Sequence, residues 1–86
     1  MDYLFLWDDT PGGNVEHTIE HGLTTDEVES AFDFVEVETT SRSTSRPAIF
    51  GRTFNGDVIF VVYDLDKDDD GRDFIYVRTA YLVEDD

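Results

Sequence analysis

The chain contains no cysteine, so neither a disulfide nor a thiolate metal site can stabilise its fold. No stretch approaches the ~20 apolar residues of a membrane-spanning helix, and no charged-then-apolar signal segment opens the sequence. Lysine is nearly absent: Lys67 is the single lysine, and the other five basic residues are arginines. We therefore expect a cytoplasmic protein that makes no membrane contact and depends on a hydrophobic core.

Basic residues are scarce in general: six of them face 21 acidic ones, which gives a formal net charge of −15. A charge of this sign repels nucleic acids and anionic membranes at long range. Molar salt shortens the Debye length to about 3 Å, so one interpretation is adaptation to a high-salt host. The other is that acidic side chains simply solvate the surface, and the two are compatible.

The length and composition indicate one domain over residues 1–86. Forty per cent of the residues are hydrophobic and 14% are aromatic, which is enough for a single core. The pattern of elements predicts an α+β fold, in which two N-terminal helices pack on a mainly antiparallel sheet of three to five strands in the order β-α-α-β-β-β. Residues 84–86 are expected to form a frayed acidic tail.

Short-range signals place the first strand and both helices. The apolar run Leu4–Trp7 predicts a strand, and a helix is expected over Gly13–His21, with Gly22 as its left-handed C-cap. Thr24 and Glu27 form the capping box of a second helix. Its apolar residues recur at i, i+3, i+4 and i+7 and should face the core: Val28, Ala31, Phe32 and Val35.

The second half of the chain has the pattern of strands. Alternating valines and glutamates near Val35 indicate an edge strand, followed by a loop over Thr40–Ser45. The continuous apolar run Val58–Tyr63 is typical of a central strand and Phe74–Val83 of a final one, with the charged loop Asp64–Asp73 between them.

The dipeptide Asn55-Gly56 between two apolar runs predicts a two-residue type I′ hairpin. Arg52 would then pair with Ile59, and a similar register in the next hairpin places Arg78 opposite Ile59 as well, about 10 Å from Arg52. One face of the sheet would carry Arg46, Phe50, Arg52, Tyr76 and Arg78. The other would receive the helices and carry Ile49, Phe60, Val62, Ile75 and Val77.

The segment Thr39–Gly56 has no acidic residue, although 21 of the 86 residues in the chain are acidic. It contains Arg42, Arg46 and Arg52, and the predicted sheet adds Arg78. Arginines among aromatic side chains suit phosphate or carboxylate groups, because guanidinium offers fork-shaped donors and stacks on rings. The alternative is that these arginines only balance neighbouring carboxylates.

Two weaker patterns concern metals. His17 and His21 are four residues apart on the first helix, but the H-E-x-x-H order is missing. We expect no metal or other cofactor there, and His21 suits interaction with the helix dipole or proton transfer. The loop Asp66–Gly71 matches the first half of a calcium loop, but its twelfth position is Val77 instead of glutamate, so we favour a solvated acidic turn.

Several short motifs follow one another along the chain: Trp7-Asp8, Asn14, His17, His21-Gly22-Leu23-Thr24, Arg46 and Phe50-Gly51-Arg52-Thr53. With these motifs the chain resembles, between Phe5 and Tyr81, the BrnT-type toxins, which are related to RelE. The resemblance implies a compact sheet with two N-terminal helices, a metal-independent ribonuclease acting on RNA, and a cognate antitoxin as protein partner. On this model His21, Arg52, Arg78 and Tyr81 would be catalytic. The acid-free segment and the predicted arginine face add candidates for RNA or anion binding: Arg42, Arg46, Phe50 and Tyr76.

Two positions depart from the toxin pattern. Glu20 stands where the family has a lysine, and Tyr81 stands where it has a basic residue. Both changes remove positive charge from the expected RNA surface, and RNA affinity depends on such contacts. The alternative function is therefore a non-enzymatic module of the same fold, in which the acidic surface or the edge strand binds a basic protein. The sequence leaves the oligomeric state open.

Overall fold

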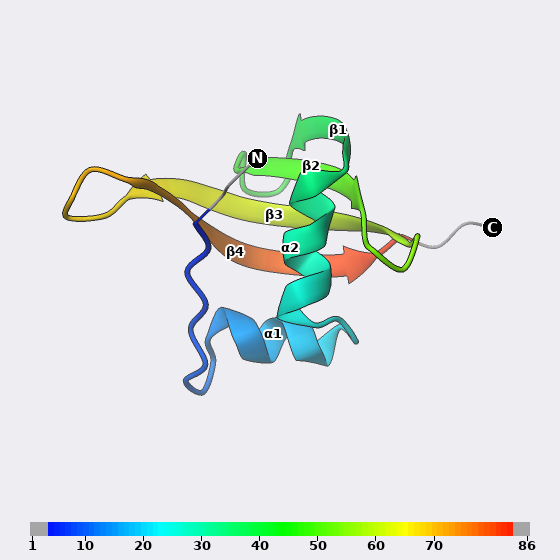
Figure 1. The fold of residues 1–86 in the computed structure, drawn as a ribbon, viewed down its shortest axis with the longest axis horizontal. Coiled ribbons are helices and arrows are strands. Elements are labelled where there is room, and N and C mark those ends of the chain that lie inside the picture. The colour runs from blue at the N-terminus through cyan, green and yellow to red at the C-terminus, as the bar shows by residue number, and fades with distance from the viewer. Residues whose placement is uncertain (1–3, 84–86) are drawn as a thin grey trace.

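A computed structural model describes residues 4–83 of the chain. Two helices come first, α1 (Asn14–Glu20) and α2 (Thr25–Asp33). Four strands follow: β1 (Val35–Thr40), β2 (Pro47–Arg52), β3 (Val58–Lys67) and β4 (Asp73–Leu82). They form one antiparallel sheet in the order β1-β2-β3-β4, with α2 across one face and α1 beside β4 (Figure 1). The predicted α+β class is confirmed.

The predicted first strand is reduced to a single bridge. Phe5 pairs in parallel with Ile75, and two backbone hydrogen bonds flank the pair, from the Leu6 amide to the Ile75 carbonyl (2.9 Å) and from the Ile75 amide to the Leu4 carbonyl (2.7 Å). The predicted order with three strands after the helices was wrong, because four strands follow them. The predicted tail over residues 84–86 lies outside the described residues.

Both predicted helix boundaries between α1 and α2 are confirmed. Gly22 takes a left-handed φ of 79°, and the Leu23 amide bonds back to the Thr18 carbonyl at 3.1 Å, which closes the last turn of α1 as a Schellman motif. The Glu27 amide donates a hydrogen bond to the Thr24 hydroxyl at 3.1 Å, and the Thr24 amide donates one to the Glu27 carboxylate at 3.1 Å. This reciprocal capping box fixes where α2 begins.

The core lies between α2 and the face of the sheet that we call the inner face. Val28, Ala31 and Phe32 of α2 are buried as predicted, but Val35 belongs to β1 and is 37% exposed. Gly51 lets β2 approach α2 closely, because a Cβ atom there would overlap the Ala31 carbonyl oxygen. The buried cluster comprises Leu23, Val28, Ala31, Phe32, Ile49, Ile59, Val61, Ile75, Val77 and Ala80.

The β2–β3 hairpin has a three-residue loop, not the predicted two-residue loop. The Gly56 amide donates to the Thr53 carbonyl at 2.9 Å, and the Thr53 amide donates to the Asp57 carbonyl at 2.8 Å. Within this turn Gly56 alone has a positive φ, 86°, whereas a type I′ turn needs positive φ at Asn55 too. The turn therefore combines type I geometry with a left-handed glycine, and the extra loop residue shifts the pairing by one.

The shifted register corrects the predicted faces of β3. Arg52 pairs with Val58 instead of Ile59. Since side chains alternate between faces, Phe60 and Val62 turn away from the helices, while Ile59 and Val61 enter the core. The placement of Phe60 and Val62 on the helix side was wrong for this reason.

The β3–β4 register differs from the prediction as well. Val62 pairs with Thr79 but Tyr63 pairs with Val77, so Arg78 is the extra residue of a β-bulge. Ile59 pairs with Leu82, not with Arg78. Because β3 runs on to Lys67 and β4 begins at Asp73, the expected loop over residues 64–73 shrinks to residues 68–72.

Candidate functional site

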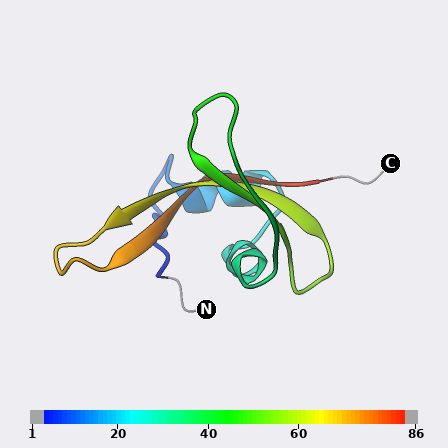
Figure 2. The same ribbon diagram turned by 90° about the horizontal axis from the view of Figure 1, so that it is seen from above.

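The outer face of the sheet, opposite α2, carries most of the predicted site residues. Strand pairing arranges its side chains in three successive rows across β2, β3 and β4. The rows are an aromatic row of Phe50, Phe60 and Tyr81, a middle row of Ala48, Val62 and Thr79, and a charged row of Arg46, Asp64, Tyr76 and Arg78. The loop between β1 and β2 rises on this same side, away from α2 (Figure 2).

The aromatic row forms a continuous platform. The ring centroids of Phe50 and Phe60 are 4.7 Å apart with an angle of 50° between the rings. Phe60 and Tyr81 follow at 5.4 Å and 46°. These tilted contacts hold the rings in place, and they leave Tyr81 44% exposed.

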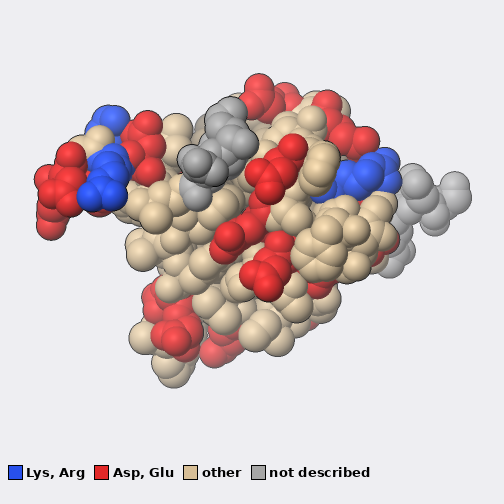
Figure 3. All heavy atoms as spheres, viewed as in Figure 1, with Lys and Arg blue, Asp and Glu red and all other residues tan. Residues whose placement is uncertain are grey.

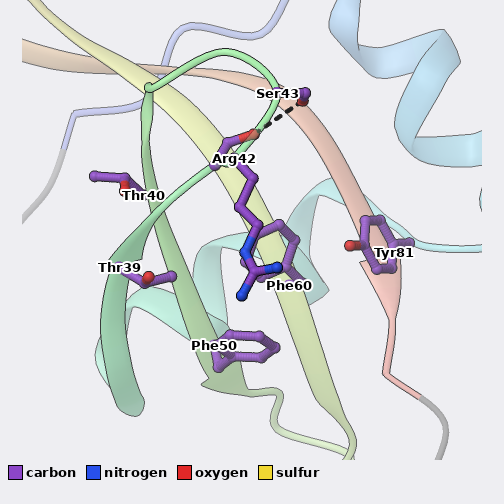
Figure 4. Close-up of a pocket in the computed structure, with 8 residues that line it drawn as sticks. Thr39, Thr40, Arg42, Ser43, Phe50, Phe60 and Tyr81 are labelled. Carbon is purple, nitrogen blue, oxygen red and sulfur yellow. Dashed lines mark hydrogen bonds between the residues drawn. The ribbon is translucent and has the colours of Figure 1, made fainter.

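A hollow of about 470 Å³ lies over this platform (Figure 4). Its lining residues are Thr39, Thr40, Ser41, Arg42, Ser43, Phe50, Phe60 and Tyr81. The Arg42 side chain extends from the β1–β2 loop toward Phe50 and Phe60 (Figure 4). The hydroxyls of Ser41 and Ser43 lie 3.2 Å apart. The lining drawn from the described residues contains no carboxylate. The hollow therefore offers aromatic surface, hydroxyl groups and one cation.

Arg42 differs from the other basic residues in its freedom. Within residues 4–83 the remaining five basic side chains each form an ion pair with an acidic one: Arg46, Arg52, Lys67, Arg72 and Arg78. Arg42 is exposed and forms no ion pair in the part of the chain that the structure describes. Its guanidinium is thus available to an anionic group that enters the hollow.

Arg46 and Arg78 share the carboxylate of Asp64. Arg46 Nε donates to one carboxylate oxygen at 2.8 Å, and Arg78 Nε donates to the other at 2.5 Å. The Tyr76 ring lies under the Arg78 guanidinium, 4.9 Å from ring centroid to Cζ. Partial desolvation by itself raises the pKa of Asp64, but the hydrogen bonds and charges of Arg78 and Arg46 outweigh it and lower the pKa below its usual value.

Arg52 lies at the opposite end of the outer face. Its guanidinium donates to the Gly56 carbonyl at 2.6 Å and to the Glu36 carboxylate at 3.2 Å. Arg52 pairs with Val58, which is six residues from Asp64 along β3, a span of about 20 Å at ~3.3 Å per residue. The predicted separation of about 10 Å between Arg52 and Arg78 was wrong, because both hairpin registers differ from those expected.

His21 lies close to the aromatic row. Its ring centroid is 6.4 Å from that of Tyr81, across the β4 edge of the sheet. His17 instead points to Glu20, with 3.6 Å between Nδ1 and the carboxylate. Of the four residues to which the resemblance assigns catalysis, His21 and Tyr81 are therefore neighbours, while Arg52 and Arg78 lie apart from each other.

The acidic turn between β3 and β4 satisfies its own backbone. One Asp68 carboxylate oxygen accepts the amides of Asp70 (3.0 Å) and Arg72 (2.8 Å). Over the described residues, no group of three or more histidine, cysteine or acidic side chains gathers in a way that could hold a metal ion. The Asp68 carboxylate therefore organises this turn by binding backbone amides.

Sequence reasoning missed Phe60 and the hydroxyl groups of the hollow. Phe60 was assigned to the wrong face by the one-residue shift in the hairpin. The segment Thr40–Ser45 was predicted only as a loop, although its hydroxyl-rich composition was visible in the sequence.

The opposite side of the molecule is acidic. Carboxylates are spread over the helix-covered surface, and basic side chains in this view lie at the two ends of the molecule (Figure 3). An anionic ligand is therefore expected on the outer face and not over the helices.

Within residues 4–83, no helix has the length and apolar character required to cross a membrane. Comparisons of the chain with protein-family models, with characterised proteins and with solved structures find no match.

Proposed function

We propose that the chain is a BrnT-like protein that binds single-stranded RNA on its outer face and cleaves it beside Tyr81. The observation that carries this proposal is the hollow, where Arg42, which forms no ion pair with any residue between 4 and 83, lies over a row of three aromatic rings. Proteins bind single strands by stacking bases on aromatic side chains and by neutralising phosphates with arginine. The hollow therefore offers a cation for a phosphate group and aromatic rings for bases at the same place.

The free energy of stacking favours a ligand with aromatic rings, such as nucleotide bases. Stacking of one base on an aromatic side chain contributes about 1–3 kcal/mol, and the row offers Phe50, Phe60 and Tyr81. The net charge of −15 opposes a polyanion at long range. In molar salt the Debye length falls to about 3 Å, which removes most of that repulsion while stacking persists.

The cleavage step follows from the pair His21 and Tyr81. In the proposed reaction the His21 imidazole accepts the proton of a ribose 2′-hydroxyl, whose oxygen attacks the adjacent phosphorus. The P–O5′ bond breaks, the Tyr81 hydroxyl protonates the leaving 5′-oxygen, and a 2′,3′-cyclic phosphate remains. Arg42 stabilises the charge that develops on the phosphate. No metal takes part in this scheme.

A binding assay with a matched control tests the surface. Anisotropy of a labelled ten-nucleotide single-stranded RNA, measured from 0.1 to 2 M KCl, should show Arg42→Gln binding about five- to thirtyfold more weakly, which corresponds to about 1–2 kcal/mol. The control is Arg72→Gln, which removes the same charge from an arginine paired with Asp70 in the distant turn. Equal losses in both variants would refute a site at the hollow.

Cleavage and toxicity are tested separately from binding. The products should carry a 2′,3′-cyclic phosphate, and His21→Asn should abolish cleavage while RNA binding persists. Induced expression in a bacterial host should arrest growth, and co-expression of the adjacent gene, as the proposed cognate antitoxin, should relieve the arrest. Harmless expression together with intact RNA would reject the ribonuclease.

A second candidate function rests on β1. All six residues of this edge strand, Val35–Thr40, are exposed, and its outer edge pairs with no other described strand. An extended basic peptide could add to this edge, with its cations beside Glu36 and Glu38. Binding of such a peptide, with no affinity for RNA at any salt concentration, would favour the non-enzymatic module.

A further inference from the structure

We propose that Arg46 and Arg78, oriented by Asp64, form a second anion subsite that binds a phosphate group farther along the RNA strand that occupies the hollow. We call these three residues the arginine clamp. The inference rests on the proposed function, and it assigns to Asp64 the part of a positioning residue.

The hydrogen bonds of the clamp leave its best donors free. Each guanidinium uses its Nε–H group to reach Asp64, at 2.8 Å from Arg46 and 2.5 Å from Arg78. The terminal nitrogens of both arginines form no hydrogen bond with any other described residue. Planar guanidinium groups bind phosphate oxygens through such paired N–H donors.

The clamp is also positive and held in place. Two guanidinium groups and one carboxylate give the three residues of the clamp a net charge of +1, and Asp66 lines the same pocket as Asp64 and Arg78. Tyr76 supports one guanidinium from below, at 4.9 Å. Since Asp64 fixes both arginines before a ligand arrives, binding costs less conformational entropy than it would with two free side chains.

The position of the clamp suits a strand that already occupies the hollow. Asp64 and Phe60 lie on the same face of β3, four residues apart, which is about 13 Å. Between them lies the middle row, where Ala48 and Val62 are buried and no acidic side chain interrupts the path among the described residues. A single nucleoside monophosphate is too short to reach both subsites, whereas an oligonucleotide can.

Asp64→Asn separates positioning from simple charge. Removal of a carboxylate makes the face more positive, so electrostatics alone predicts tighter RNA binding. Loss of the group that orients both arginines predicts the opposite, and we expect the dissociation constant for the ten-nucleotide RNA to rise at least fivefold. The matched control is Asp66→Asn, because Asp66 lies two residues along the same face, is exposed and accepts only the Lys67 amide among described groups.

The expected pattern is therefore specific. Asp66→Asn should bind the RNA as tightly as the parent chain or more tightly. The nucleoside uridine should bind both variants equally, because it has no phosphate for the clamp and can occupy only the hollow. Far-UV circular dichroism shows whether each variant keeps its fold. Tighter RNA binding by Asp64→Asn, equal to that of Asp66→Asn, would overturn the clamp while leaving the hollow intact.

A second measurement does not depend on RNA. Titration with inorganic phosphate, followed by the Nε–Hε resonances of Arg46 and Arg78, should shift both signals in the parent chain and neither in Asp64→Asn. If RNA fails to bind but these shifts occur, the clamp stands as an anion site and the proposed function falls. If phosphate moves neither resonance in the parent chain, the clamp is refuted whatever RNA does.

Discussion

Gly51→Ala tests the contact that places the sheet against α2. A Cβ atom at Gly51 would lie 2.9 Å from both the carbonyl carbon and the Cβ atom of Ala31, and closer still to the carbonyl oxygen. Ordinary contacts between carbon atoms are about 3.5–4.0 Å, so α2 must withdraw by roughly 1 Å. Such a gap forfeits a quarter to a half of each dispersion contact, including those of the buried Val28 and Phe32.

Overpacking of this kind costs about 2–3 kcal/mol. In a domain of this size each kcal/mol lowers the melting temperature by about 4–8 °C, so we expect a decrease of roughly 8 to 24 °C. Thermal unfolding followed by circular dichroism in 2 M KCl provides the measurement. Gly71→Ala is the control, because Gly71 has a φ of 81° and open space around it, so that its substitution costs only the ~1 kcal/mol of a strained backbone. A loss at Gly51 no larger than the loss at Gly71 would refute the packing described for α2.

Three further predictions concern single contacts. Thr24→Ala removes the capping box with Glu27 and should lower the free energy of unfolding by about 1 kcal/mol in urea titrations; no change would mean that water replaces the cap at no cost. Trp7→Phe removes the 2.7 Å hydrogen bond from the indole to Glu29 and should cost about 0.5–1.5 kcal/mol, whereas an unchanged urea midpoint would show that the bond adds nothing. The pKa of Asp64 is lowered in the folded chain. The contribution of its ionised carboxylate to the free energy of unfolding is therefore complete above the pKa of the unfolded chain, about 3.9, and is lost as the pH falls through the pKa of the folded chain. The stability difference between the parent chain and Asp64→Asn should therefore be constant above about pH 5 and shrink in more acidic buffer, and a constant difference down to pH 2 would contradict the pairing.

Local signals in the sequence were enough to find the helices. The capping box at Thr24 and the left-handed Gly22 depend on residues within one turn of each other, so neighbouring residues in the sequence determine their geometry. The apolar stripe of α2 likewise predicted which side meets the sheet. Its last member, Val35, was misplaced because the helix had already ended at Asp33.

The register of the strands depends on more than a local motif can specify. Asn55-Gly56 fits both a two-residue and a three-residue loop, and the difference of one residue turned Phe60 from the core to the outer face. The bulge at Arg78 reversed the alternation in β4 and has no sequence signal that we could identify. The arginines were correctly expected on one face, but the same two shifts separated Arg52 from the others along the sheet.

The open edge of β1 has a consequence for self-association. If two copies met antiparallel along this edge with Val37 opposite Val37, Glu36 of each would lie across from Glu38 of the other. Like charges directly opposite one another destabilise strand pairing. Glu36 and Glu38 therefore disfavour edge-to-edge association of two sheets through β1. Concentrated salt screens the repulsion between these glutamates. The salt concentrations that let RNA approach the hollow should therefore also favour association of two copies along β1.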